Sequence, residues 1–190
     1  AGRLTVQQGG TVESRGDRSV PGGRITVAAP LISIAGTLDA SGSDAGTIEL
    51  RAGTGGNGGI TITSTGVVIV DALKAGGWGG TIDARTAGLA GEVGDVVVDG
   101  LLAARGKAGT QDTGGGTGGS ITVIAGGNIR GSAAARVFAS GGTPDGDGGA
   151  IEFSTLVGSF NLPALIDAHS AGIDSAGGSV RIDTAFDLTV

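Results

Sequence analysis

The chain has 190 residues, of which 42 are Gly and 39% are hydrophobic, while only 3% are aromatic. This much Gly without a three-residue period excludes collagen, and the apolar fraction is too high for a disordered linker. The net charge is −6 and the few Lys and Arg residues are scattered along the sequence. Because a nucleic-acid-binding protein carries clustered basic residues, we expect no nucleic-acid partner.

Cys and Met are both absent, so the fold must be stabilised by packing and hydrogen bonds rather than by disulfides. No apolar run approaches the roughly 18 residues that a helix needs to cross a bilayer. We therefore expect no membrane insertion.

Three short segments follow one another and then recur along the chain. In the first repeat they are an apolar stretch, Leu4–Val6, a strand with a corner, Thr11–Gly16, and a phrase of the form GGxIxV, Gly22–Ala29. A repeat this regular predicts an array rather than a single wound domain.

The later copies keep the same order. The apolar stretch returns at Leu31–Gly36, Ile60–Gly66, Asp95–Gly100, Asn128–Gly131, Ser159–Leu162 and Asp187–Val190. The strand with a corner returns at Thr37–Gly42, Val70–Gly77, Leu101–Gly106, Val137–Gly142 and Ile166–Gly172. The GGxIxV phrase returns at Ala45–Ala52, Gly79–Thr86, Gly118–Ala125, Gly148–Thr155 and Gly177–Thr184.

The GGxIxV phrase alternates apolar and polar residues with a period of two. Ile25 and Val27 share one face, and Arg24 and Thr26 share the other. This alternation predicts a strand with one buried face, and no helical period survives for long without meeting a Gly. Equivalent inward positions are expected at Ile48, Leu50, Ile121, Val123, Val180 and Ile182.

The connections between these strands predict the topology. Wide corners rich in Gly, Ser and Asp replace the two-residue turns of hairpins, so each strand should pair in parallel with its copy in the next repeat. The sequence therefore predicts an all-β, right-handed parallel β-helix, a solenoid of about six three-strand coils with Gly-rich corners and uncapped ends. We attribute the Gly content to positive φ angles at the corners.

The same register makes a prediction for the charged residues of the outer face. It stacks Glu49 on Asp83 and Arg51 on Arg85, so that opposite charges lie beside and diagonal to one another. Pairs at these spacings attract across neighbouring strands.

Several Gly-rich words resemble ligand-binding loops. The GxGxxG words at Gly53–Gly58 and Gly114–Gly119 precede strands, whereas a dinucleotide site needs a following helix. Gly100–Gly109 has the wrong spacing for a phosphate loop. Asp145–Gly149 resembles the start of a calcium loop but has Leu156 where the bidentate Glu belongs, so a solvated corner is the favoured interpretation. We expect no cofactor and no metal.

Three aspartates of the strand-with-corner segment are the candidates for acid–base chemistry. Asp39, Asp71 and Asp167 are predicted to occupy equivalent positions, as the carboxylates of a polysaccharide-cleaving β-helix would. Because Ala103 and Phe138 interrupt this set, the favoured interpretation is that each Asp accepts backbone N–H bonds at its corner.

The aromatic and imidazole side chains offer two further candidates. Trp78 is the only Trp and could stack on a sugar or cap a hydrophobic corner, of which capping is favoured. His169, the only His, has no nucleophile motif around it. We therefore predict no catalytic residues and retain Trp78, Asp39, Asp71 and Asp167 as candidate glycan contacts.

The repeat is already under way at Leu4 and still running at Val190, without the polar capping unit of a complete solenoid. We expect residues 1–190 to form a single β-helix segment excised from a longer repeat protein.

The segment Gly22–Leu50, GGRITVAAPLISIAGTLDASGSDAGTIEL, resembles the repeat of filamentous-haemagglutinin-type exoproteins, the two-partner-secretion adhesins of Gram-negative bacteria. The resemblance implies a right-handed β-helix, export through a dedicated outer-membrane transporter, and a secreted fibre at the cell surface, as in a biofilm. It carries over no binding residues.

The leading hypothesis is therefore a non-catalytic shaft of a secreted adhesin or matrix fibre. Its partners would be other coils of the same parent chain, and surface glycans or a host or neighbouring cell. Two alternatives stay open: a filament subunit that stacks end to end with copies of itself, and a carbohydrate-binding or polysaccharide-active β-helix.

Overall fold

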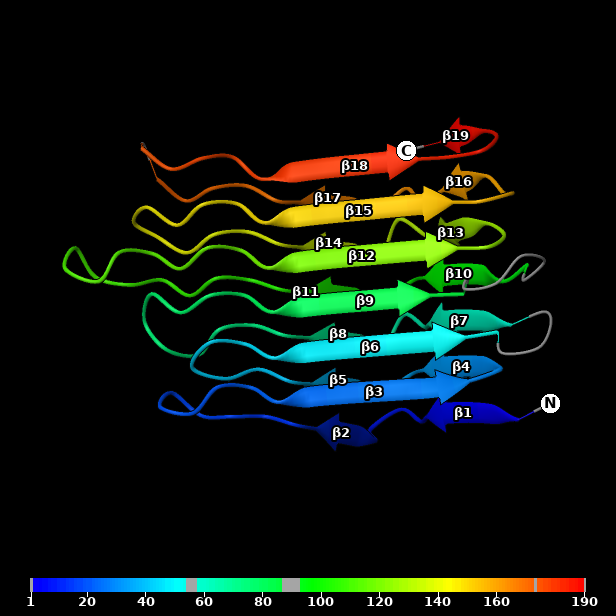
Figure 1. Cartoon of the computed structure of the whole chain (residues 1–190), viewed down its shortest axis with the longest axis horizontal. Helices are drawn as coiled ribbons and strands as arrows, with labels where there is room; N and C mark the ends of the chain where they lie inside the picture. The colour runs from blue at the N-terminus through cyan, green and yellow to red at the C-terminus, as the bar shows by residue number, and fades with distance from the viewer. Residues whose placement is uncertain (1, 54–57, 87–92, 173, 190) are drawn as a thin grey trace.

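The computed structural model describes residues 2–53, 58–86, 93–172 and 174–189. Within these residues the chain is all-β, and its strands form three parallel sheets stacked as a solenoid of about six coils (Figure 1). Each coil contributes one strand to each sheet, so every strand pairs with its counterparts in the preceding and following coils. The predicted fold class is confirmed.

The three sheets correspond to the three recurring segments. Sheet A contains β1 (Arg3–Val6), β4 (Leu31–Ile34), β7 (Gly59–Ile62), β10 (Asp95–Val98), β13 (Ile129–Gly131), β16 (Phe160–Asn161) and β19 (Leu188–Thr189). Sheet B contains β2 (Thr11–Glu13), β5 (Thr37–Asp39), β8 (Val67–Ile69), β11 (Leu101–Ala103), β14 (Arg136–Phe138) and β17 (Leu165–Asp167). Sheet C contains β3 (Arg24–Ala29), β6 (Thr47–Ala52), β9 (Thr81–Arg85), β12 (Ser120–Ala125), β15 (Ala150–Thr155) and β18 (Ser179–Asp183).

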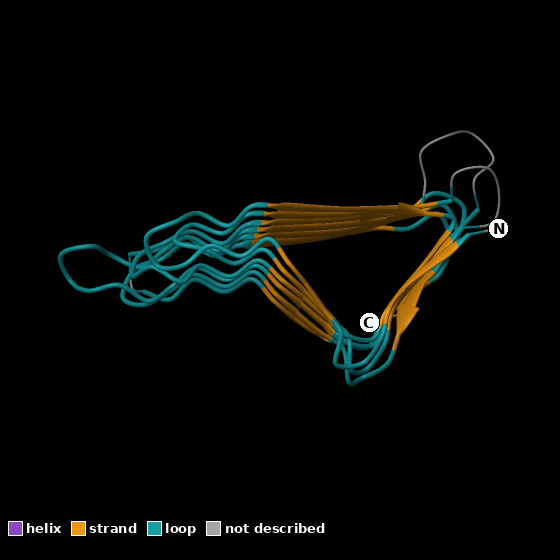
Figure 2. Cartoon of the chain, turned by 90° about the horizontal axis from the view of Figure 1, so that it is seen from below, coloured by secondary structure: helices purple, strands orange, loops and turns teal. Residues whose placement is uncertain are grey.

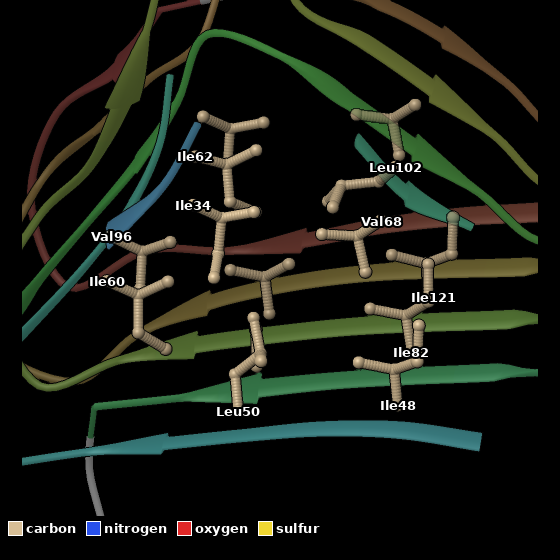
Figure 3. Close-up of a cluster of buried hydrophobic side chains, with 14 of the residues drawn as sticks. Ile34, Ile48, Leu50, Ile60, Ile62, Val68, Ile82, Val96, Leu102 and Ile121 are labelled. Carbon is tan, nitrogen blue, oxygen red and sulfur yellow. The ribbon is translucent and has the colours of Figure 1, made fainter. Parts of the chain in front are cut away.

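The three sheets form a triangle when viewed along the axis (Figure 2). Stacked aliphatic side chains fill the core inside it. Ile48 pairs with Ile82, and Ile82 pairs with Ile121, and all three side chains are fully buried (Figure 3). Phe153 and Phe160 add an edge-to-face contact with ring centroids 5.2 Å apart. Each buried aliphatic side chain contributes about 1.5–3 kcal/mol, so these stacks are the main source of stability inside the triangle.

The predicted inward columns are confirmed along sheet C. Ile25 pairs with Ile48, and Val27 with Leu50. Val180 continues the same column opposite Ile151, but it is 48% exposed because β18 is the last strand of the sheet.

Beyond one corner of the triangle, the loops that join sheet B to sheet C project as a flat extension, which we call the wing (Figure 2). Its described residues are 14–23, 40–46, 70–80, 104–119, 139–149, 168–172 and 174–178. In each coil an outgoing layer leaves sheet B and a returning layer leads into sheet C. Backbone bonds join the coils within each layer, as in Val70 N–H to Ala103 O at 2.8 Å and Gly79 N–H to Thr117 O at 2.9 Å.

The paired glycines of the GGxIxV phrase join the two layers of the wing. Gly119 N–H donates to Ala104 O of the same coil at 2.6 Å, and Gly80 N–H donates to Val70 O at 2.9 Å. A Cβ added to Gly119 would lie 2.0 Å from Gly80 O, and a Cβ added to Gly118 would lie 2.0 Å from Ala139 O. No side chain fits at these positions.

This close packing corrects the predicted reason for the Gly content. Among the described residues, positive φ angles occur only at Gly9, Gly53, Gly76 and Gly114, and none of these belongs to a GGxIxV pair. The paired glycines are needed because the backbone of a neighbouring coil occupies the space of a Cβ, not because the chain turns through a left-handed conformation. Residues 54–57 of the predicted GxGxxG segment Gly53–Gly58 lie outside the described residues.

Candidate functional site

The candidate aspartates do not form the stack that the sequence predicted. In sheet B, Glu13 pairs with Asp39, which pairs with Ile69. The position then passes through Ala103 and Phe138 to Asp167. Asp71 is two residues beyond this position, level with Ser41, because Ala72 bridges Gly42. The predicted equivalence of Asp71 with Asp39 and Asp167 is wrong.

The spacing of the remaining two aspartates does not suit acid–base chemistry. Four ladder steps separate Asp39 from Asp167, and at about 4.8 Å per step this is roughly 19 Å. Glycoside hydrolysis needs two carboxyl groups about 5–9.5 Å apart. The structure therefore does not bring Asp39 and Asp167 together as a catalytic pair.

Each of these two aspartates instead closes a turn at its own corner. Asp39 accepts Ser41 N–H at 2.8 Å, and Asp167 accepts His169 N–H at 2.9 Å. His169 Nδ1 is also 2.7 Å from Asp167. Partial burial raises the pKa of Asp167, but the hydrogen bonds from His169 outweigh this effect and leave the pKa below its ordinary value. The prediction that Asp39 and Asp167 accept backbone N–H bonds at their corners is confirmed.

Asp71 joins two coils rather than closing a turn. Its carboxylate accepts Arg105 N–H at 2.7 Å and Arg105 Nε–H at 2.8 Å, so it binds both the backbone and the side chain of the next coil. The Arg105 guanidinium in turn lies over the Phe138 ring, with Cζ 5.8 Å from the ring centroid. A charge-assisted fork of this kind is among the stronger polar contacts in a protein.

Trp78 is in the returning layer of the wing, whereas the three aspartates lie on sheet B and the outgoing layer. Its backbone N–H donates to the Asp44 carboxylate at 3.1 Å, and its backbone carbonyl accepts Ala45 N–H at 3.0 Å. The residue is 65% exposed, so the prediction that its ring caps a hydrophobic corner is wrong. Trp78 and the aspartates do not form one site.

A shallow groove of about 520 Å³ runs along the junction of the wing with sheet C, and its lining begins at Gly79, the residue that follows Trp78 in the sequence. The paired glycines of successive coils form its floor, beginning with Gly79 and Gly80. Thr81, Ser120 and other small residues line the rest. The groove offers hydroxyl groups and backbone atoms but no ionisable side chain.

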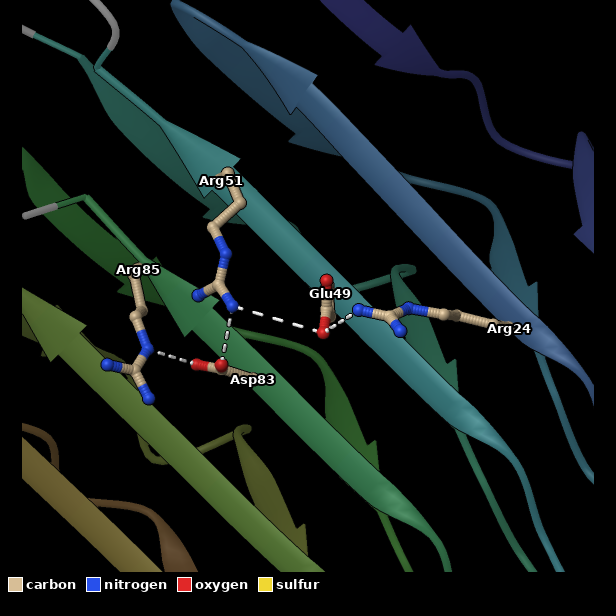
Figure 4. Close-up of polar contacts among 5 residues, drawn as sticks. All are labelled: Arg24, Glu49, Arg51, Asp83 and Arg85. Atoms are coloured by element: carbon tan, nitrogen blue, oxygen red, sulfur yellow. Dashed lines mark hydrogen bonds and ion pairs between the residues drawn. The ribbon is translucent and has the colours of Figure 1, made fainter. Parts of the chain in front are cut away.

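The outer face of sheet C holds a network of ion pairs (Figure 4). Arg24 Nη2 lies 2.5 Å from Glu49 Oε1, and Arg51 Nη2 lies 2.8 Å from Asp83 Oδ2. Arg85 Nε lies 2.6 Å from Asp83 Oδ1. Each of the first two contacts runs diagonally between strands, so the predicted arrangement of charges is confirmed.

The network lowers the pKa of its carboxylates. The hydrogen bond from Arg24 lowers the pKa of Glu49. Partial burial raises the pKa of Asp83, but the hydrogen bonds from Arg51 and Arg85 outweigh burial and give a net lowering. These groups are paired structural charges rather than acids poised to transfer a proton.

Other aspartates also serve as links between coils, a role that the sequence analysis missed. Asp95 accepts Asn128 N–H at 2.8 Å, and Asp147 accepts Ala176 N–H at 2.7 Å. Asp145 accepts Gly115 N–H at 2.6 Å, so the word Asp145–Gly149 is a corner that binds backbone. Short acidic side chains next to Gly-rich corners are the signal that could have revealed these links.

Among the residues that the structure describes, no three His, Asp or Glu side chains lie close enough together to hold a metal ion. Within the same residues, no helix is long and apolar enough to span a bilayer.

The comparisons with known proteins add no homologue. No family model matches the chain, and neither the curated proteins nor the solved structures contain a match to it.

Proposed function

We propose that this chain is a structural shaft segment of a secreted fibre or adhesin at the surface of a Gram-negative bacterium, without catalytic activity. The observation that supports this role best is the unbroken parallel register of three sheets through six coils. Such a stack keeps the triangle of sheets constant along its axis and transmits force through many backbone bonds in parallel. The resemblance of Gly22–Leu50 to filamentous-haemagglutinin-type repeats supports the location.

The use of the acidic residues is a second support. Asp71, Asp95 and Asp147 each bind the backbone of a following coil, so their carboxylates are engaged in holding the stack together. A shaft needs such links along its whole length, whereas an enzyme needs its carboxylates gathered at one place.

The location can be tested on cells that produce the protein. Antibodies raised against the chain should label intact cells, and mild external protease should remove the label. Immunogold electron microscopy should place the label on projecting fibres. Labelling that requires permeabilised cells would contradict the proposal.

A second candidate, a filament subunit that stacks end to end, is favoured by the exposed apolar residues at the C-terminal edge. Phe186 is 67% exposed and Leu188 is 52% exposed. Unpaired strand edges are templates for further pairing. However, β19 already occupies the position in sheet A that β1 of a second copy would take when β2 and β3 extend the other two sheets. Unbroken stacking therefore requires β19 to be displaced.

Electron microscopy and sedimentation velocity of the purified chain separate this candidate from the first. A filament subunit should form long fibres whose growth stops in Val180→Asp, because Val180 lies in β18, the edge strand on which β3 of the next copy would pair. Discrete particles at every concentration would exclude it.

A third candidate, glycan binding without cleavage, is favoured by the exposed ring of Trp78, which precedes Gly79 of the Gly-lined groove in the sequence. An aromatic ring open to solvent can stack on a sugar face. A glycan-array signal that disappears in Trp78→Ala would support this candidate, and an array without signal would exclude it.

A further inference from the structure

The wing contains a notch on its outgoing side, which arises because the loops of successive coils differ in length. The loop of the second coil, residues 40–46, turns back earlier than its neighbours 14–23 and 70–80. A hollow of about 290 Å³ remains between the first coil and the later ones. We call it the basic notch, and it is lined by Arg15, Gly16, Asp17, Arg18, Leu73 and Lys107, with no residue of the second coil.

Cations lie on both walls of the basic notch. Arg15 and Arg18 belong to one wall, and Lys107 belongs to the other. Arg15 is 3.6 Å from Asp39. Within the described part of the chain, neither Arg18 nor Lys107 has a carboxylate within ion-pair distance. Two charges of the notch therefore lack a counter-ion from those residues.

The one carboxylate of the notch, Asp17, is engaged by its own loop. It accepts Ser19 N–H at 2.6 Å, Ser19 Oγ–H at 2.7 Å and Val20 N–H at 2.9 Å. The hydrogen bonds from Ser19 lower the pKa of Asp17, so the group stays ionised at neutral pH. The lining thus holds three cationic groups against one anionic group on a protein whose net charge is −6.

Both walls are held in place by backbone bonds to neighbouring coils. Gly16 N–H donates to Ser41 O at 2.8 Å, and Lys107 N–H donates to Gly77 O at 3.0 Å. Lys107 O in turn accepts Gly116 N–H at 3.0 Å. A second hollow of about 370 Å³, lined by the Asp71–Arg105 ion pair among others, shares Lys107 and lengthens the surface along the axis.

We propose that the basic notch binds an acidic polysaccharide through the carboxylate or sulfate groups of its sugars. The charges of a polysaccharide are widely spaced along its chain. A short stretch of such a chain can therefore be bound by three cations without a larger basic surface around them. Double-stranded DNA carries one charge per about 1.7 Å and would meet repulsion from the rest of this acidic molecule. The lining also contains no aromatic side chain on which the bases of a single strand could stack.

This inference goes beyond the shaft role and does not depend on it. A shaft that carried such a site would be fixed laterally to the acidic polymers of a matrix or capsule.

Calorimetric titration of the whole chain with defined oligosaccharides tests the proposal. A tetramer of galacturonate supplies carboxylates, a sulfated dextran oligomer supplies sulfates, and neutral dextran supplies neither. We expect binding of one or both anionic oligomers, no binding of neutral dextran, and affinity that falls at least about fivefold between 50 and 300 mM salt. Which anionic oligomer binds identifies the source of the charge.

Variants then locate the site. Arg18→Gln and Lys107→Gln should each lower the affinity about three- to tenfold, and the double variant should abolish measurable binding. Arg3→Gln removes the same charge from the exposed strand β1 and should leave the affinity within about twofold. Asp17→Asn keeps an oxygen acceptor for Ser19 and should raise the affinity, because it removes the one negative charge of the notch.

Circular dichroism of each variant should match that of the parent chain. The proposal is overturned by equal binding of neutral dextran, by the absence of binding to either anionic oligomer, or by equal losses in Arg3→Gln and Lys107→Gln. Binding of a DNA oligonucleotide more tightly than either oligosaccharide would overturn the assignment of the ligand class.

Discussion

The triangular core and the wing are built by the same chain but are held together by different interactions. In the core, aliphatic side chains such as Ile82 and Ile121 stack on one another and exclude water. In the wing, two layers of backbone pack directly against each other, and Gly118 and Gly119 contact carbonyl oxygens where a side chain would otherwise lie.

Because of this difference, the core and the wing should tolerate different kinds of substitution. A hydrophobic core accepts one aliphatic residue for another when volume is conserved, because side chains can repack. The paired glycines of the wing have no side chains to repack, so a methyl group added at Gly119 meets backbone of the neighbouring coil. The core should therefore be sensitive to lost volume and the wing to added volume.

The largest expected effect is the loss of volume in the core. Phe153→Ala removes a fully buried ring that contacts Phe160, and it should lower the free energy of unfolding by about 3–5 kcal/mol. Phe153→Leu keeps most of the volume and should lower it by about 1 kcal/mol. Urea titration of both variants measures the difference, and equal losses would show that Phe153 does not pack as described.

In the wing, added side-chain volume should lower the free energy of unfolding. Gly119→Ala places a Cβ 2.0 Å from Gly80 O, and we expect a loss of about 2–3 kcal/mol. Gly177→Ala is the matched control, because a Cβ there meets no atom within 4 Å. Its effect should stay within about 0.5 kcal/mol. Similar thermal unfolding of the two variants would contradict the close packing of the wing.

A smaller effect is expected at the boundary between the two regions. Asp71→Ala removes the acceptor of the Arg105 backbone N–H and side chain, and should cost about 1–2 kcal/mol. Asp112→Ala, at an exposed loop position, serves as the control and should change stability by less than about 0.5 kcal/mol. If Asp112→Ala costs as much as Asp71→Ala, the link between coils contributes nothing specific.

The smallest effect concerns the ion pairs on the outer face of sheet C. The pKa values of Glu49 and Asp83 are lowered in the folded chain, from the ordinary values of 4.5 and 3.8. Stability from these groups is therefore fully present above about pH 5 and is lost as the pH falls below 4.5 through the lowered values.

Thermal unfolding between pH 7 and pH 3 measures this loss. The midpoint should be flat down to about pH 5 and then fall, and the fall should be shallower in the Glu49→Gln, Asp83→Asn double variant. An unchanged acid slope in that variant would show that these pairs are not coupled to folding.

The core could be predicted from the sequence because its signal is carried by side chains. Ile25, Val27, Ile48 and Leu50 alternate with polar residues, and this alternation fixes the faces of β3 and β6, while the shared GGxIxV phrase fixes their register. The diagonal partners of Arg24 and Arg51 follow from that register without further information.

The register position of Asp71 could not be predicted by aligning similar sequence segments. The dipeptide Asp-Ala occurs at Asp39 and at Asp71, but the inward residues Val68 and Val70 set the register, and they place Ile69 beside Asp39. Sliding by two residues keeps each side chain on its face, so alternation alone does not reveal the error.

The close backbone packing of the wing could not be predicted for a different reason. Residues without side chains leave no periodic pattern, so the sequence shows that Gly is abundant but not which backbone approaches it. The basic notch is hidden in the same way, because Arg18 and Lys107 are far apart in the chain and meet only through the unequal loop lengths.

Distances along one column of sheet C test the stacking of coils most directly. The column Thr26, Glu49, Asp83, Thr122, Glu152 and Arg181 faces outward. Since the chain has no Cys, spin labels can be attached in pairs at Thr26 and at one of Thr122, Glu152 or Arg181. Parallel coils in register predict backbone separations of about 14, 19 and 24 Å, rising by one strand spacing per coil. Distances from pulsed electron–electron double resonance that fail to rise in these equal steps would contradict the parallel stacking of the coils.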